Sequence, residues 1–182
     1  TTIQNIFLAS VQRFPRDQRE LLRKLAVFVH SFTVEDAEFL QERTDADPVI
    51  ARHAIETFER DGILLREDTI FLFKHEVFKQ ALYNSILNHN KRILHKLIAD
   101  RMRAFPNPHT GRLLHHLTRA EEWTDVRALL QDAPDGSFNM EYLDFYDTLL
   151  EHLDAKEHGA RTYLLFRKCT ILFNNGRSER AD

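Results

Sequence analysis

Apolar residues recur at helical spacing along almost the whole chain, and this rhythm is interrupted once, over residues 63–73. There, two short apolar runs, 63–66 and 69–73, flank the polar pair Glu67 and Asp68, a pattern typical of a β-hairpin. With only 5 Gly and 5 Pro, the chain has too few turn residues for a β-rich protein. We therefore expect a mainly α fold with one small hairpin.

Three short helices are expected before the hairpin, after a lead-in helix near the start of the chain. Pro15 suits the first turn of the first helix, and Pro48 suits that of the third. Thr33 and Asp36 can form a capping box at the start of the second. The helices are expected over residues 15–28, 33–40 and 48–61. Three short helices followed by a hairpin is the layout of a winged-helix domain, which we assign to residues 1–88.

From His75 onward the chain is expected to be entirely helical. After two helices that precede Pro106, four shorter helices are expected, over residues 110–119, 122–132, 138–153 and 157–175. Their short links favour antiparallel helical hairpins. Residues 116–130 have the order of one tetratricopeptide-like unit: a helix, a turn, the aromatic Trp123 and a second helix. We assign residues 89–182 to a helical-repeat segment truncated at its C-terminal end, and we expect both chain ends to be boundaries within a longer protein.

Cys169 is the only cysteine, so neither an intrachain disulfide nor a cysteine-based zinc site is possible. It lies in a helical apolar stretch with Leu165 and Leu172, and we expect its thiol to be buried. No signal peptide and no apolar run of about 18 residues is visible, which argues against export by that route and against a membrane span. We therefore expect a cytoplasmic protein with no membrane partner.

No pattern for catalysis or metal binding is visible. The chain has 10 His, but the adjacent His115 and His116 would point about 100° apart on a helix. No His-Glu-x-x-His sequence occurs, and no serine lies in a nucleophile elbow. We therefore expect no catalytic residues and no metal site.

Three stretches of the chain resemble one family of regulatory ATPases. They are Arg13-Phe-Pro-Arg-Asp-Gln-Arg-Glu-Leu-Leu-Arg-Lys-Leu-Ala-Val-Phe, Phe71-Leu-Phe-Lys-His-Glu-Val-Phe-Lys-Gln-Ala-Leu-Tyr-Asn-Ser-Ile-Leu and Asn90-Lys-Arg-Ile-Leu-His-Lys-Leu-Ile-Ala-Asp-Arg-Met. Their order is similar to the region that follows the ATPase core in signal-transduction ATPases with numerous domains. These are AAA+-related proteins that include maltose-regulator-like activators and proteins fused to adenylate cyclase domains. The resemblance covers about residues 10–132 and implies a winged helix followed by helical repeats.

The resemblance also implies that an ATPase core precedes this region. Such a core holds nucleotide phosphates in a glycine-rich loop that ends in Lys-Ser or Lys-Thr. No such loop is present here, because the glycines lie far apart, at Gly62, Gly111, Gly136, Gly159 and Gly176. We therefore expect no cofactor on this chain, ATP or ADP on an upstream domain, and that domain as a partner.

The family's junction between wing strand and helix falls at His75. In plant immune receptors and apoptotic ATPases of this class, a histidine at a similar place contacts the terminal phosphate of the nucleotide and locks the inactive state. The resemblance implies this role for His75, with Lys74 adding positive potential. The receptor pattern has Asp after the histidine, whereas this chain has Glu76. The alternative is that His75 caps the following helix and packs under the hairpin.

A winged helix also raises the possibility of DNA binding through its third helix. The formal net charge of the chain is −3, which gives no reason to expect nucleic acid. The third helix is itself close to neutral, with Arg52, His53 and Arg60 against Glu56, Glu59 and Asp61. Groove-reading helices present a basic surface, so DNA is the weaker expectation. The basic run from Lys91 to Arg103 is interpreted as a solvated helix face.

Aromatic residues concentrate in the third helix of the repeat segment. Phe138, Tyr142, Phe145 and Tyr146 cannot all be buried on one side of an amphipathic helix. We expect Tyr142, Phe145 and Tyr146 to line a groove that receives a peptide or another protein. The alternative is that a following repeat covers them.

Three functions remain open at this point. The first is a noncatalytic regulatory and protein-interaction segment of a multidomain signalling ATPase or transcription regulator. In it, the winged helix acts as a latch on the ATPase core and the helical repeats sense a partner. The second is a DNA-binding winged-helix regulator, and the third is a stand-alone helical scaffold or adaptor.

Overall fold

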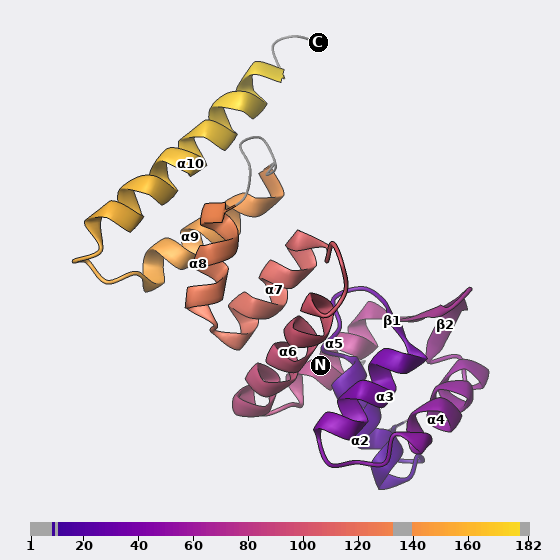
Figure 1. Cartoon of the computed structure of the whole chain (residues 1–182). Coiled ribbons are helices and arrows are strands. Elements are labelled where there is room, and N and C mark those ends of the chain that lie inside the picture. The colour runs from indigo at the N-terminus through magenta and orange to yellow at the C-terminus, as the bar shows by residue number, and fades with distance from the viewer. Residues whose placement is uncertain (1–8, 10, 133–139, 179–182) are drawn as a thin grey trace. The chain divides into compact units, whose positions relative to one another are not determined.

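The computed structural model describes residue 9 and residues 11–132 and 140–178 (Figure 1). The described chain is mainly helical, as the sequence predicts, and the expected hairpin is part of a small three-stranded antiparallel sheet. It forms two compact units, residues 1–104 and 105–182. Most of the expected lead-in helix lies outside the described residues.

The first unit contains five helices and three short strands within its described residues. The helices are α2 (Arg16–Leu25), α3 (Val34–Arg43), α4 (Val49–Arg60), α5 (Glu76–Asn84) and α6 (Asn88–Arg103). The strands are β1 (Phe32–Thr33), β2 (Leu64–Glu67) and β3 (Ile70–Phe73). The hairpin expected over residues 63–73 is confirmed as β2 and β3.

Helix α3 begins and helix α4 ends where the sequence predicts, and each boundary has a local cause. Thr33 Oγ1 accepts a hydrogen bond from the Asp36 backbone N–H at 3.2 Å, and the Asp36 carboxylate accepts one from the Thr33 N–H at 3.0 Å. This capping box satisfies two backbone donors at the start of α3. Gly62 has a φ of 70°, a left-handed conformation that ends α4 at little steric cost.

The sheet has the strand order β1-β3-β2, and all its pairings are antiparallel. Phe32 is opposite Phe71, and Leu64 is opposite Phe73. These four side chains are buried in the core of the first unit. The helices complete that core with Leu21, Leu22, Leu25, Leu40, Ile55 and Phe58.

The boundary between the units differs from the one expected after residue 88. Helix α6 belongs to the first unit, because Leu94 and Ile98 are part of its buried core and α6 packs on α3. Arg101 adds an ion pair from α6 to Asp36 at the start of α3, with 3.4 Å between Nε and Oδ1. These contacts cannot be read from a helical pattern alone.

The second unit consists of successive helices that pack on one another. They are α7 (Thr110–Ala120), α8 (Trp123–Asp132), the 3-10 turn η1 (Met140–Tyr142), α9 (Leu143–His152) and α10 (His158–Ser178). Each of the helices from α7 to α9 packs on the next, and α9 also packs on α7. Of the predicted helices, those over 110–119 and 122–132 are confirmed within a residue or two.

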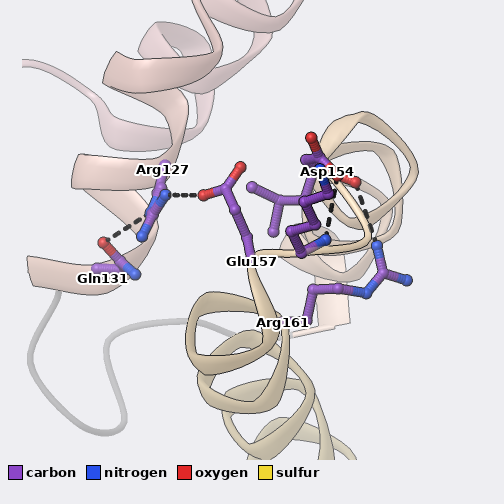
Figure 2. A network of polar contacts seen from close by, with 7 residues as sticks. Arg127, Gln131, Asp154, Glu157 and Arg161 are labelled. Atoms are coloured by element: carbon purple, nitrogen blue, oxygen red, sulfur yellow. Dashed lines mark hydrogen bonds and ion pairs between the residues drawn. The ribbon is translucent and has the colours of Figure 1, made fainter.

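A group of polar contacts ties α8 to the segment before α10 (Figure 2). Arg127 Nη1 lies 2.5 Å from Glu157 Oε2, and its Nε donates a hydrogen bond to Gln131 Oε1 at 3.4 Å. Arg161 Nη1 donates to the Leu150 carbonyl at 2.9 Å, which joins α10 to the end of α9. We call Arg127, Gln131 and Glu157 the polar clip. The clip connects α8 to the segment between α9 and α10.

The expectation of a buried Cys169 is wrong, because this side chain is exposed. Helix α10 is apolar on two sides. The side that packs on α9 is the one opposite Cys169. The buried side carries Ala160, Leu164, Arg167 and Ile171. Within the described ranges, no helix combines the length and apolar character that a membrane span requires.

Candidate functional site

A pocket of about 520 Å³ opens in the second unit between α7, the start of α8 and η1–α9. Helix α7 contributes His115 and Arg119, and α8 contributes Trp123. Helix α9 contributes Asp144, Phe145 and His152. We call this pocket the α7–α9 groove. Its size suits a few side chains of a polypeptide segment.

One wall of the α7–α9 groove is a pair of stacked rings. The ring centroids of Trp123 and His152 are 3.8 Å apart, and the ring planes differ by 21°. His152 Nδ1 lies 2.7 Å from the Thr148 carbonyl oxygen, and this hydrogen bond from side chain to backbone fixes the imidazole on α9. The stack therefore presents a flat, preformed aromatic surface, which binds a ligand at little entropic cost.

The charged residues that line the groove are mostly acidic. Arg119 is the one cation among them, against the carboxylates of Glu121, Glu141 and Asp144. Carboxylates therefore outnumber guanidinium groups in the lining. An apolar segment with basic residues is therefore the complementary ligand.

The three aromatic residues predicted to line a groove have different positions. Phe145 does line it. Tyr142 lies next to Phe145, with 6.3 Å between ring centroids, and its hydroxyl packs close to Gly111 on α7. Tyr146 is fully buried at 0% exposure, so the prediction that it contacts a partner is wrong. Phe138 lies outside the described residues.

Tyr146 is buried because it shares a face of α9 with Leu149 and Leu150, which point into the unit's interior. Its hydroxyl donates a hydrogen bond to the Leu130 carbonyl at 3.4 Å. Burial raises the pKa of the Tyr146 phenol, and the nearby Arg167 opposes that shift. Tyr146 therefore supports the groove from behind rather than lining it.

Arg167 belongs to a buried polar group that the sequence did not reveal. Its Nη1 lies 3.2 Å from the Tyr163 hydroxyl, which in turn donates to the Gln131 carbonyl at 2.9 Å. These bonds connect α10 to the last turn of α8. The only signal in the sequence was the basic pair Arg167 and Lys168 within an apolar helical stretch, and arginine side chains are mostly exposed.

His116 lies next to the groove residue His115 but is itself buried. Burial lowers the pKa of His116 to about 3, and the positive charges of His115 and Arg112 add to this effect. His116 is therefore uncharged in the folded protein at neutral pH. The wall behind α7 is consequently fixed and neutral.

The structure places His75 at the junction of β3 and α5, as predicted. Its backbone is extended, with a φ of −128°, and its side chain makes no hydrogen bond that caps α5. The side chains of Lys74 and His75 are both exposed. His75 is therefore the N-cap residue of α5 through its backbone, whereas its exposed side chain is not packed under the hairpin.

The surface of α4 is not a basic one. The exposed Arg52 pairs with Glu38, at 3.2 Å between Nη2 and Oε1. The tip of the β2–β3 hairpin carries the acidic residues Glu67 and Asp68. Neither surface offers the concentrated positive charge that DNA phosphates attract.

A second pocket, of about 420 Å³, lies in the first unit between α2 and the α5–α6 segment. Its wall includes Lys24, whose Nζ donates to Gln41 Oε1 and Thr44 Oγ1, both at 2.6 Å. Burial lowers the pKa of Lys24. These hydrogen bonds hold the ammonium group in the wall, where it connects α2 to α3.

Within the described residues, no three His, Cys, Asp or Glu side chains are placed so that they could hold a metal ion together. Comparison of the chain with protein-family models, with curated proteins and with solved structures gives no match. The α7–α9 groove and the β3–α5 junction are therefore the features from which a function is proposed.

Proposed function

We propose that this chain is a noncatalytic regulatory segment whose second unit binds a stretch of polypeptide in the α7–α9 groove. The observation that carries the proposal is the preformed aromatic and acidic lining on two helices. Trp123 and Phe145 offer apolar surface, and Asp144 offers a carboxylate beside them. A polypeptide segment with both apolar and basic side chains would complement the apolar surface and the carboxylate.

The groove is well suited to binding because its walls are fixed before a ligand arrives. The polar clip connects α8 to the segment before α10 (Figure 2). The stacked ring of His152 connects α9 to the start of α8. A site of this kind loses little conformational freedom when it binds, which favours affinity.

The finer architecture of the second unit is part of this proposal. Helices α7 and α8 would form one tetratricopeptide-like unit, and α9 and α10 a second. The packing of α9 on both α7 and α8 supports this arrangement. In it, the first helices of successive units line the binding surface, and α7 and α9 supply most of the groove lining.

For the first unit we propose a winged-helix domain that acts as a latch on an ATPase core. The element order α2-β1-α3-α4-β2-β3 and the strand order β1-β3-β2 support the winged-helix assignment. The exposed Lys74 and His75 at the strand–helix junction suit contact with a nucleotide phosphate on that core. ATP or ADP would then be bound by the core, and peptide binding in the second unit would bias the latch.

DNA binding by the first unit is the alternative function that the same layout favours. The charges of α4 and of the hairpin tip argue against it. A gel-shift titration with a short duplex at low salt decides the matter, because nonspecific phosphate contacts are strongest there. We expect no shift, and a salt-dependent shift would replace the latch proposal with the DNA-binding one.

The peptide-binding proposal is tested by binding the chain to an array of random peptides and reading the composition of the bound set. We expect enrichment of peptides that combine Lys or Arg with apolar residues. Asp144→Arg should reduce their binding by about tenfold, because it replaces attraction with repulsion at the groove.

Glu151→Arg is the matched control for this test. Glu151 lies on the same helix, is exposed, and does not line the groove. Both substitutions change the net charge equally, so an effect of overall charge would appear in both. Equal loss in the two variants, or no compositional preference in the wild type, would contradict the proposal.

A further inference from the structure

Helix α10 presents an exposed apolar face that the peptide-binding proposal does not use. Its buried side packs on α9, and the side chains of the opposite side are exposed. The large side chains of the open side are Leu165 at 48% exposure, Phe166 at 67%, Leu172 at 44% and Phe173 at 58%. Cys169, also exposed, lies in the middle of them. We call these five residues the α10 stripe.

Among its described residues, the exposed side of α10 carries no Asp, Glu, Lys or Arg side chain. The charged residues among its described side chains are Arg161, Arg167 and Lys168, and all three are at least partly buried. Lys168 forms an ion pair with Asp147 on α9, and Arg161 donates to carbonyls at the end of that helix. The other exposed residues of its described part are His158, Gly159, Thr162 and Asn174. A helix face that stayed in water would carry charges instead.

The α10 stripe is symmetric about Cys169. Leu165 and Phe166 precede the cysteine by the same spacings at which Phe173 and Leu172 follow it. On a helix, these positions lie on one face, within about 60° of Cys169. A two-fold axis through Cys169 in an antiparallel helix pair would therefore place Leu165 against Phe173 and Phe166 against Leu172. Each aromatic ring then meets an aliphatic side chain, and each cysteine meets its copy.

We propose that the α10 stripe binds the α10 stripe of a second copy of this chain, in an antiparallel, two-fold symmetric pair. A closed two-fold interface must be complementary to itself, and the pattern around Cys169 meets that condition. Among the described side chains of the exposed face there is no Asp, Glu, Lys or Arg, so none of these opposes self-pairing by like-charge repulsion.

The area available sets the strength of this pair. A large aromatic side chain buries about 150–250 Å² when it is fully covered. Four large side chains per copy, each about half exposed, would bury about 600–1,000 Å² in total, less than a standard specific interface and in the range of weak, transient ones. The pair is therefore weak and depends on protein concentration.

Sedimentation equilibrium of the chain under reducing conditions tests the proposal, and we expect a monomer–dimer equilibrium with a dissociation constant on the order of 10 μM. Phe166→Glu places a charge in the seam and should weaken the dimer by at least about tenfold. Val49→Glu is the matched control, because Val49 is an exposed apolar residue on α4 at 75% exposure. That variant should form the dimer as the wild type does. Circular dichroism of each variant verifies that it remains folded.

The position of the axis is tested by oxidation with diamide. Helices packed at about 8–10 Å would bring the two Cys169 Cα atoms within about 4–6 Å, a distance that a disulfide spans. Two thiols lose two protons and two electrons to diamide, which becomes the hydrazine, and one S–S bond forms. We expect rapid formation of a covalent dimer in the wild type and much slower formation in Phe166→Glu. Cys169→Ser should abolish the covalent product while keeping the noncovalent dimer.

Three results would overturn the proposal. One is a chain that remains monomeric up to its solubility limit, which would mean that the α10 stripe does not bind a second copy of this chain. Another is a dimer that Phe166→Glu does not weaken, which would place the interface elsewhere. The third is a diamide product that forms equally fast in Phe166→Glu and wild type, since random collision would explain it. Because Phe145→Ala should leave the dimer intact, the result is independent of peptide binding in the groove.

Discussion

At the scale of single residues, the second unit places polar groups where their protonation state is fixed. His116 is buried behind the groove residue His115, and burial holds its pKa at about 3. Tyr146 is also buried, with its hydroxyl bonded to the Leu130 carbonyl. These residues add no chemistry to the groove. They make its walls rigid, and they connect the stability of this unit to pH.

His116 predicts a specific sensitivity to acid. Its pKa in the folded chain is about 3, below the value of 6.5 in the unfolded chain, so the unfolded chain binds the proton first as pH falls. The free energy of unfolding should therefore decrease below about pH 6.5, by about 2 kcal/mol at about pH 5. Urea unfolding followed by the fluorescence of Trp123, which lies in this unit, measures the change.

The control for this prediction is a pair of histidine variants. His116→Leu should lose that part of the acid sensitivity, whereas His158→Gln, at an exposed position on α10, should keep it. An identical decrease in stability between about pH 7.5 and about pH 5 in wild type and His116→Leu would show that His116 does not contribute.

At the scale of elements, local chemistry explains which features the sequence predicts. The capping box of Thr33 and Asp36 and the hairpin after Gly62 depend on neighbouring residues only, and both are confirmed. Strand β1 has two residues, too few to show an alternating pattern, and it exists because it pairs with β3. Which side of α10 is buried depends on α9, so the exposure of Cys169 could not be foreseen.

The same reasoning applies to the candidate site. An excess of aromatic residues in one helix predicts that some of them lie outside the core, and Phe145 does line the groove. Periodicity does not say which member is buried, and Tyr146 is the buried one. The ring stack of Trp123 on His152 joins residues from two helices, so no local sequence pattern predicts it.

Thr33 allows a test of an individual helix start. Thr33→Ala removes the hydroxyl that accepts the Asp36 N–H, and we expect a loss of about 1 kcal/mol in the free energy of unfolding. Urea denaturation followed by circular dichroism measures it. Thr57→Ala is the control, since Thr57 is within α4 and its hydroxyl bonds only to the carbonyl of His53 and the side chain of Arg60. Loss of equal size in both variants would argue against a capping role.

At the scale of the whole molecule, the chain divides into two units with different proposed roles. The first unit, residues 1–104, would act as a latch through Lys74 and His75. The second unit, residues 105–182, would bind a polypeptide segment. Neither role includes a chemical step, so the chain would act by changing which conformation of a larger assembly is populated.

The proposal predicts that this chain alone neither binds ATP tightly nor hydrolyses it. The physical reason is that its glycines are too far apart to form a loop that cradles phosphates. Phosphate release and the anisotropy of a fluorescent ATP analogue measure the two properties. ATP turnover that a substitution within the chain abolishes would contradict the noncatalytic assignment.

The most direct test of the central claim is the fluorescence of Trp123 during a titration with a synthetic peptide of alternating Lys and Leu. Trp123 is the only tryptophan of the chain and forms a wall of the groove, so in the folded chain its emission is sensitive to a ligand at that site. We predict a saturable change in emission, with an affinity that Asp144→Arg weakens by about tenfold and Glu151→Arg leaves unchanged. Emission that stays constant while the peptide binds, or equal weakening in both variants, would contradict the claim that the α7–α9 groove is the binding site.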